Sequence, residues 1–239
     1  WARAEFLRVR CLKTKGVMGW TSDEDILLGP RLWAEAGWSS PLLGGESAAL
    51  FSLFYQDGIA SGPWLWLRRA GGTLMRTEDG WRNNLFYLDS NLFLRTSEYS
   101  NLVLAASLDG YGAPDLRGVV YLGAGEGLRG YGYRTEAGSR RLRATLQEKV
   151  MLFDNVLSLG NLGFAVFYDG GMVWGWGAPS GDARWLQSVG VGLRFENLRS
   201  KVARVARLDI GYASSGPDRG WQVTLATGDW FVFNPFGHF

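Results

Sequence analysis

Hydrophobic and polar residues alternate with a period of two along almost the whole chain. Successive side chains of a β-strand point to opposite faces, whereas a helix repeats about every 3.6 residues, so this period predicts strands. Two stretches, 162–171 and 188–196, show the pattern most clearly. One face carries Leu162, Phe164, Val166, Tyr168, Val189, Val191, Leu193 and Phe195, and the other carries Gly163, Ala165, Phe167, Asp169, Gly171, Ser188, Gly190, Gly192, Arg194 and Glu196.

Eleven segments follow this rhythm and predict an all-β chain. Their approximate bounds are 3–15, 26–40, 46–58, 63–77, 81–97, 99–110, 139–152, 162–174, 185–197, 203–214 and 219–233. The connections include "TSDED", "LLGGE", "QDGIASGP", "TEDG" and "SSGPDRG", which contain the residues preferred in hairpin turns. We therefore predict one antiparallel meander that forms a single domain over residues 1–239.

The length of these segments bears on the environment of the sheet. Many run for 11–15 residues, whereas strands of soluble proteins typically have about 5–6. A soluble sandwich with its apolar faces turned inward gives the same alternation, and a soluble all-β binding domain remains an alternative. In a bilayer every backbone N–H and C=O must be paired within the protein, so a membrane sheet closes into a barrel. We predict a transmembrane antiparallel up-and-down β-barrel of about 12 strands, because an even number is expected.

Tryptophan supports the membrane interpretation. The chain has 12 tryptophans, and ten of them cluster near the ends of the segments, where outer-membrane barrels carry girdles of aromatic residues at the lipid headgroups. An ordinary aromatic core is the alternative. The predicted girdle consists of Trp20, Trp38, Trp64, Trp66, Trp81, Trp174, Trp176, Trp185, Trp221 and Trp230.

Closure of such a barrel would place the charged face of each segment around a wet lumen. We expect Leu7 and Val9 to face outward. The residues expected in the lumen are Arg8, Arg10, Arg31, Glu35, Asp89, Arg95, Asp169, Arg194, Arg207 and Asp209.

Composition argues against several functional classes. The net charge is +2, from 25 basic and 23 acidic residues, which does not indicate a nucleic-acid-binding protein. Cys11 is the single cysteine and His238 the single histidine, so neither an internal disulfide nor a histidine-based site is expected. The stretch "GAGEG" at 123–127 lacks the Lys-Ser/Thr of a phosphate-binding loop. We expect no catalytic residues, cofactor or metal.

No apolar run reaches the roughly 18–20 residues of a membrane helix, and no N-terminal signal is visible in a chain that starts at Trp1.

The longest stretch without strand rhythm is 111–138, and it contains "GLRGYGYR" at 127–134. Residues 121–134, "YLGAGEGLRGYGYR", resemble the sixth extracellular loop of the BamA/TamA superfamily of outer-membrane assembly and translocation barrels, also called bacterial surface antigen barrels. Its V/L-R-G-F/Y tetrad reads here as Leu128, Arg129, Gly130 and Tyr131. The elements that follow resemble the same family in the same order, over roughly residues 100–233. They are the segment 139–152, "GFAVFYDGG" at 163–171, "VGVGLRF" at 189–195, "RLDIGYA" at 207–213 and an aromatic-rich last strand.

This resemblance implies that the loop folds into the barrel and that Arg129 pairs with Asp169 of the F-x-D-x-G strand. Alternation agrees, since it places Phe167, Asp169 and Gly171 on the lumen face. A guanidinium and a carboxylate can form a bidentate, charge-assisted pair there. Gly130 would let the backbone approach the wall and Tyr131 would pack against it. A flexible surface loop is the alternative.

A second partner of Arg129 is expected on the strand after the loop, in "LQEKVML" at 146–152. If alternation holds, Gln147 and Lys149 face the lumen with Arg141, Arg143 and Thr145, while Glu148 faces outward. A β-bulge would reverse this, so both Gln147 and Glu148 are candidates.

The resemblance also implies a location and a function. It points to the bacterial outer membrane and to the insertion or transport of proteins there. The implied partners are outer-membrane lipids, other envelope proteins or unfolded outer-membrane clients. The odd count of eleven segments separately allows a missed strand, an upstream strand or closure with a second copy of the chain. The chain departs from the family in strand number, since the family barrel typically has sixteen strands and preceding periplasmic repeats, and in the ending "NPFGHF" after Phe231 and Phe233. A non-catalytic membrane anchor or scaffold that binds partner proteins, or a small pore, is the alternative.

Overall fold

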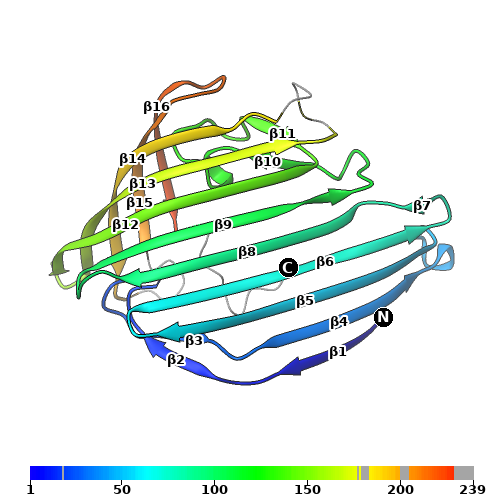
Figure 1. Ribbon diagram of the computed structural model, residues 1–239, viewed down its shortest axis with the longest axis horizontal. Coiled ribbons are helices and arrows are strands. Elements are labelled where there is room, and N and C mark those ends of the chain that lie inside the picture. Colours follow the sequence, from blue (N-terminus) through cyan, green and yellow to red (C-terminus); the bar gives the residue numbers. More distant parts are fainter. Residues whose placement is uncertain (18, 177, 179–182, 200–204, 229–239) are drawn as a thin grey trace.

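The computed structural model describes residues 1–17, 19–176, 178, 183–199 and 205–228. The described chain is all-β, and most of it forms one large curved antiparallel sheet (Figure 1). The strands of this sheet are β1 (Ala2–Leu7), β4 (Arg31–Ser39), β5 (Ala48–Ser61), β6 (Trp64–Thr77), β7 (Gly80–Trp81), β8 (Asn84–Arg95), β9 (Ser100–Gly112), β12 (Arg140–Val156), β13 (Gly160–Trp174), β14 (Leu186–Asn197), β15 (Val205–Ala213) and β16 (Gly220–Thr227).

The order of strands in the sheet is β1-β4-β5-β6-β8-β9-β12-β13-β14-β15-β16, with the short β7 paired to β6. Apart from β7, each strand of the sheet is therefore paired with the strands that come before and after it in this sheet along the chain, as expected for a meander. The prediction of a large antiparallel sheet of about 12 strands is confirmed, since the sheet has 12. Within the described residues β1 and β16 each pair along one edge only, so the sheet is open as described.

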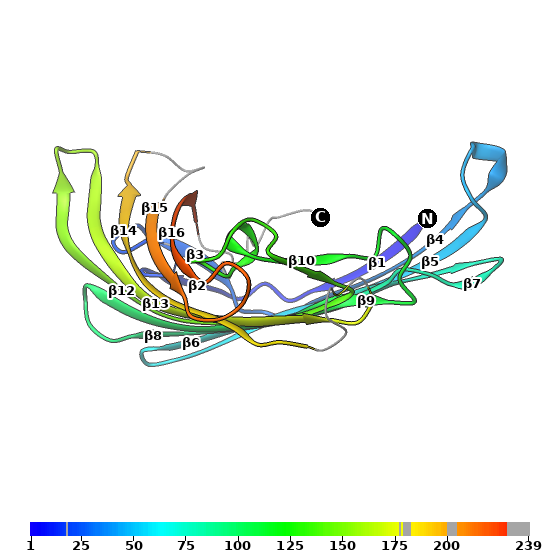
Figure 2. The same cartoon turned by 90° about the horizontal axis from the view of Figure 1, so that it is seen from above.

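The sheet bends into a trough with a concave and a convex face (Figure 2). Register fixes which side chains share a face. Val191 lies opposite Ile210 and both are exposed on the convex face, whereas Arg194 lies opposite Arg207 and both are buried on the concave face. The predicted separation of an apolar and a charged face therefore holds across β14 and β15.

The first two predicted segments are each broken in the structure. Segment 3–15 becomes β1 and β2 (Cys11–Thr14), and segment 26–40 becomes β3 (Glu24–Leu27) and β4. Pro30 has no N–H to donate to the ladder, and at this point Arg8 N donates to Pro30 O at 3.0 Å and Leu28 N to Arg10 O at 2.7 Å. The β2–β3 pair is a separate two-stranded sheet on the concave side (Figure 2).

This break corrects the predicted orientation of residues 7–10. Leu7 pairs with Arg31, so it shares the concave face with that arginine and does not face outward. Because β1 ends at Leu7, the alternation that assigned Arg8 and Arg10 to the lumen and Val9 to the outside does not continue. All three are exposed in the irregular connection to β2.

Two predicted turns are displaced. "QDGIASGP" was expected to be a connection, but β5 continues to Ser61 and the turn is made at Gly62 and Pro63. In "TSDED", Glu24 and Asp25 already belong to β3. The first difference lengthens the β5–β6 hairpin of the large sheet, and the second lengthens the separate β2–β3 hairpin.

A second small sheet, β10 (Val120–Leu122) with β11 (Glu136–Gly138), lies in the connection between β9 and β12. With the short 3-10 helix η2 (Ala124–Glu126) it folds over the concave face (Figure 2). Another 3-10 helix, η1 (Pro41–Leu43), joins β4 to β5.

Each inward element rests on its own apolar cluster. The cluster at the β2–β3 hairpin is Val17, Ile26, Leu28, Leu65, Leu67, Phe93, Val103 and Ala105. The cluster at the β10–β11 loop is Val120, Leu122, Leu128, Tyr131, Val173, Leu186 and Ala213. In the described parts of the chain no helix is both long and apolar enough to cross a membrane.

The tryptophans of the predicted girdle divide into three groups. Seven are exposed by 39% to 70% and lie at or near strand ends, namely Trp38, Trp64, Trp66, Trp81, Trp176, Trp185 and Trp221. Trp174, at the end of β13, is partly buried. Trp20 departs from the prediction, because it is only 5% exposed and is folded inward with the β2–β3 hairpin. Trp230, Phe231 and Phe233 lie outside the described residues.

Candidate functional site

The segment 127–134 is a compact loop on the concave face, between β10 and β11. Two backbone hydrogen bonds close it on itself, Leu128 N to Gly123 O and Ala124 N to Gly132 O, each 3.0 Å long. Gly127 and Gly130 have φ of 97° and 87°, a region that side chains with a Cβ rarely adopt. The local fold therefore depends on the glycines that make the segment conspicuous in the sequence.

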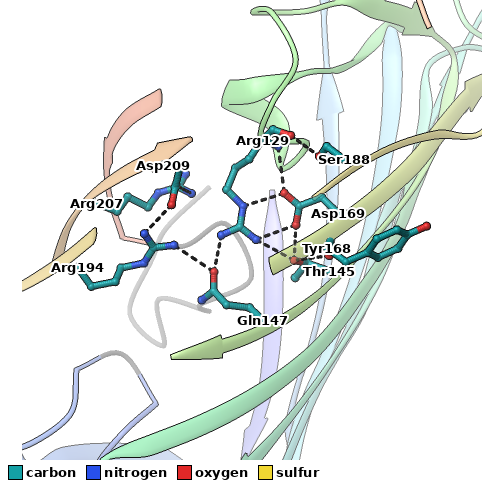
Figure 3. A network of polar contacts seen from close by, with 9 residues as sticks. All are labelled: Arg129, Thr145, Gln147, Tyr168, Asp169, Ser188, Arg194, Arg207 and Asp209. Atoms are coloured by element: carbon teal, nitrogen blue, oxygen red, sulfur yellow. Dashed lines mark hydrogen bonds and ion pairs between the residues drawn. The ribbon is translucent and has the colours of Figure 1, made fainter. Parts of the chain in front are cut away.

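Arg129 extends from this loop into the wall and meets Asp169 of β13 (Figure 3). Its Nε donates to Asp169 Oδ2 and its Nη2 to Asp169 Oδ1, both at 2.7 Å, and its backbone N–H donates to Oδ2 at 3.1 Å. The two side chains are 1% and 0% exposed. This is the bidentate geometry in which a guanidinium and a carboxylate interact most strongly.

The remaining donors of Arg129 are directed at β12. Nη1 donates to Gln147 Oε1, Nη2 donates to Thr145 Oγ1 at 3.0 Å, and Thr145 Oγ1 donates to Asp169 Oδ1. The guanidinium carbon also lies 3.6 Å from the centre of the Phe167 ring, in cation–π contact. A charge buried this deeply is therefore compensated on all sides.

Of the two candidates for the second partner, Gln147 contacts Arg129 and Glu148 does not. The pairing of β12 with β13 is in continuous register from Arg140 to Met151, so no bulge reverses the alternation there. Glu148 faces the other way, where it accepts hydrogen bonds from Ser100 Oγ and from Thr96 Oγ1, the latter at 2.7 Å.

The network continues beyond the loop to β14 and β15 (Figure 3). Gln147 Oε1 also accepts from Arg194 Nη2 at 3.2 Å. Arg194 Nη1 lies 2.6 Å from Asp209 Oδ1, and Arg207 Nη1 lies 2.9 Å from Asp209 Oδ2. Four adjacent strands are thus cross-braced to one arginine of the loop.

Gly130 brings the loop backbone against β15. A Cβ built on Gly130 would lie 3.0 Å from the carbonyl carbon of Gly211, and one built on Gly211 would lie 2.8 Å from the Cα of Gly130. Ser188 Oγ donates to Arg129 O at the same place. Two glycines therefore make the close approach possible.

The other residues of the tetrad and of the F-x-D-x-G strand fill the space around this contact. Tyr131 is 1% exposed, and its hydroxyl lies 2.8 Å from Ser215 O and accepts from Gln187 N at 3.1 Å. Leu128 is fully buried, and a Cβ on Gly171 would meet the Leu122 side chain at 3.1 Å. The structure brings together every residue singled out for the loop except Glu148.

Several contacts of the loop were not predicted individually. Arg141 Nη1 lies 3.0 Å from Glu126 Oε2, and Arg143 Nη1 donates to Glu126 O at 2.9 Å. Asp218 accepts from Gly132 N at 3.2 Å and from Thr135 Oγ1 at 2.6 Å. Alternation had placed both arginines on the lumen face, but their partners on the loop could be identified only after the loop was folded.

No model of a known protein family matches the chain, and a search of curated proteins finds none similar to it. The functional interpretation rests on the geometry of the chain itself.

Proposed function

We propose that this chain is an outer-membrane β-barrel, similar to the BamA/TamA superfamily, that assists the insertion or translocation of proteins at the outer membrane. The observation that carries the proposal is the inverted distribution of side chains, in which ionic groups are buried and large apolar groups are exposed. Soluble proteins seldom expose contiguous apolar surface on this scale. The exposed apolar residues of the convex face include Phe51, Leu53, Leu88, Leu104, Val166, Val189, Val191, Leu193, Leu208, Ile210, Val223 and Leu225.

Strand length and aromatic placement support a membrane location. A membrane strand needs about 9–11 residues to cross the hydrocarbon layer. Seven strands of the sheet have 12 to 17 residues, namely β5, β6, β8, β9, β12, β13 and β14, and β4 with 9 residues is just long enough. Trp64 and Trp66 lie at one end of the strands, and Trp38 and Trp81 lie at the other. Rings at both ends suit the two lipid headgroup layers.

The loop is braced against the wall by the contact of Arg129 with Asp169, and we call this arrangement the strut. It supports the similarity to the superfamily, because this contact is the one that the resemblance implies. The same contacts hold β12, β13 and β14 together, which would keep the rest of the wall intact while an edge of the sheet receives a client strand. Insertion would use the edges of the sheet and a locally thinned bilayer, with no catalytic residue. A client strand would pair with the outer edge of β1 or β16, which has no neighbouring strand within the described residues. A closed barrel would form when those edges meet each other or further strands.

A scaffold or anchor that binds partner proteins is the second candidate. It is favoured by the occupation of the concave face by two inward elements, the β10–β11 loop and the β2–β3 hairpin, which together restrict passage along it. In this case the barrel would hold a partner in the membrane and insert nothing.

Two experiments test the proposal. The full chain folded in detergent should migrate faster on a gel before heating than after, and it should sediment with liposomes. Solubility in plain buffer without this heat-dependent shift would contradict a membrane barrel. Liposomes that contain the chain should accelerate the folding of an outer-membrane client compared with empty liposomes. Equal folding rates, with the heat-dependent shift intact, would favour the scaffold.

A further inference from the structure

The connection between β2 and β3 forms a second inward element, which the sequence did not predict. We call its described residues, 15–17 and 19–23, the tip. The tip contacts Asn101 at the start of β9, whereas the loop follows the end of β9 at Gly112. The two elements therefore cover the concave face from opposite ends of the strands (Figure 2).

Glu196 of β14 holds one side of the tip. Its Oε2 accepts from Trp20 N at 3.0 Å and from Thr21 N at 3.4 Å, and its Oε1 accepts from Ser22 Oγ at 2.8 Å. Asn161 of β13 supports the same carboxylate and also donates to Thr21 Oγ1 at 2.7 Å. The carboxylate is fully buried beneath the tip.

On its other side the tip is closed onto its own hairpin by Glu24 of β3 and is held to the wall by Lys149 and Asn101. Glu24, 2% exposed, accepts from Val17 N at 3.1 Å and from Gly19 N at 2.7 Å. Lys149 Nζ donates to Val17 O at 3.1 Å, and Asn101 Nδ2 donates to Gly16 O at 2.8 Å. Six of these contacts use the backbone of the tip and two use the hydroxyls of Thr21 and Ser22, so the tip is held mainly through its main chain.

The fit is close, and it includes one uncompensated group. A Cβ on Gly163 would lie 2.7 Å from the Trp20 ring, and one on Gly19 would overlap the Glu196 carboxylate. Trp20 Nε1 is buried without a hydrogen-bond partner among the described residues.

When the tip opens, the Glu196 carboxylate and the backbone of the tip must exchange their hydrogen bonds to each other for hydrogen bonds to water. The concave face holds a cavity of about 580 Å³ lined by charged residues, among them Arg31, Arg69, Asp89 and Asp109. A second cavity of about 300 Å³ lies beside the tip and is lined by Lys15, Gly16, Val17 and Asn101 among others, so water can reach the backbone of the tip when its contacts break. The hydrogen bonds to the Glu196 carboxylate contribute on the order of 1.5–3 kcal/mol each, and the neutral ones from Asn161 to Thr21 and from Asn101 to Gly16 on the order of 0.5–1.5 kcal/mol each.

We infer that the tip is a lid, latched by Glu196, that covers the end of the lumen opposite the Arg129 loop and opens it to small hydrophilic solutes when it lifts. The inference about passage rests on the proposed barrel. The latch itself does not, because it concerns only contacts within the chain.

The test uses the full chain with Cys11 replaced by serine, so that introduced cysteines are the only thiols. Val17→Cys with Val103→Cys places one thiol on the tip and one on the wall, within the same buried apolar cluster and outside the side-chain hydrogen bonds of the latch. Maleimide labelling of the reduced pair reports opening, and oxidation to the disulfide locks the lid. Glu196→Gln replaces one acceptor oxygen with an N–H₂ group that faces backbone donors, so it should release the tip. Glu148→Gln is the matched control, a hydrogen-bonded glutamate on the convex face.

We expect Glu196→Gln to speed the labelling by about tenfold, as the loss of a charged hydrogen bond implies, and to raise conductance across planar bilayers. Oxidation of the cysteine pair should return conductance to the unmodified level, and Glu148→Gln should change neither. Equal labelling in Glu196→Gln and Glu148→Gln would overturn the latch. Faster labelling with unchanged conductance, in a protein that keeps its heat-dependent gel shift, would overturn the lid while leaving the barrel in place.

If Glu196→Gln does not fold, Gly19→Ala releases the tip by steric overlap and leaves the charge intact. The same labelling increase is expected. Loss of the gel shift in the unmodified chain would instead contradict the proposed barrel, and the labelling experiment would still decide on the latch.

Discussion

The Arg129 loop and the β2–β3 tip both attach an irregular segment to the sheet, but they use opposite arrangements of charge. Both bring an irregular segment onto a charged concave face. The loop inserts its own charge, Arg129, between Asp169 and Gln147 of the wall. The tip inserts no charge, and the wall instead supplies a carboxylate, Glu196, to its backbone N–H groups.

The difference determines how firmly each element is held. Removing one partner of a buried ion pair leaves an uncompensated charge, which costs about 3–5 kcal/mol. A hydrogen bond between the Glu196 carboxylate and the backbone of the tip contributes about 1.5–3 kcal/mol, and water can replace it when the tip lifts. The loop should therefore behave as a fixed strut and the tip as a movable part.

Charge reversal at Arg129 should have the largest effect and would test the strut directly. In Arg129→Glu the buried pair is lost and a like charge faces Asp169, so we expect the free energy of unfolding to fall by about 3–5 kcal/mol. Urea titration of the heat-dependent gel shift measures it. Arg134→Ala, on the same loop, is the control.

A second reversal sharpens this result. Asp169→Arg in the Arg129→Glu background should restore part of the lost stability, because the pair is re-formed with its charges exchanged. Unchanged stability in both single variants would show that the loop is not a strut.

Gly130→Ala should have the next largest effect. The residue has φ of 87° and lies against the Gly211 backbone, so left-handed strain and overpacking together should cost about 2–4 kcal/mol. Thermal unfolding in detergent measures the loss. Gly112→Ala is the control, since a Cβ there would meet only Asn84, at 3.7 Å and 3.9 Å. Equal effects of the two variants would contradict a close approach.

Asn101→Ala tests whether the tip moves separately from the loop. Loss of the bond to Gly16 O should favour tip opening by about 1–2 kcal/mol, seen as faster hydrogen exchange in the tip with unchanged exchange in the loop. Ser52→Ala, which removes a hydroxyl bonded to Thr73 elsewhere on the concave face, should leave the tip unaffected. Simultaneous loosening of the loop would mean that the two elements act as one unit.

Tyr131→Phe should have the smallest effect of this series. It removes the hydroxyl that contacts Ser215 O and Gln187 while keeping the buried ring, so we expect a loss of about 0.5–1.5 kcal/mol. Chemical denaturation would detect it beside Tyr133→Phe, whose ring is 68% exposed and whose hydroxyl should matter little. If Tyr131→Phe lowered the free energy of unfolding as much as Arg129→Glu, the tyrosine hydroxyl would hold the loop at least as firmly as the arginine.

The contrast also explains what could be predicted. The loop was predictable because its contacts depend on side chains in a recognisable order, Leu128 to Tyr131, and on alternation along β12 and β13. The tip was missed because its contacts use backbone atoms, which every residue has. Its polar letters, "TSDED", indicate only a turn, and Trp20 near them resembled a girdle residue.

The sequence by itself determined the strands, the separation of an apolar face from a charged face, and the placement of Arg129, Gln147 and Asp169 on one side. These properties follow from a local rule, the period of two along a strand. Only the tertiary structure decided that the first predicted segment divides into β1 and β2 and the second into β3 and β4. It also decided that Trp20 turns inward to Glu196, which is 176 residues away in the sequence. Such contacts depend on which distant strands the curved sheet brings face to face, and no local period contains that information.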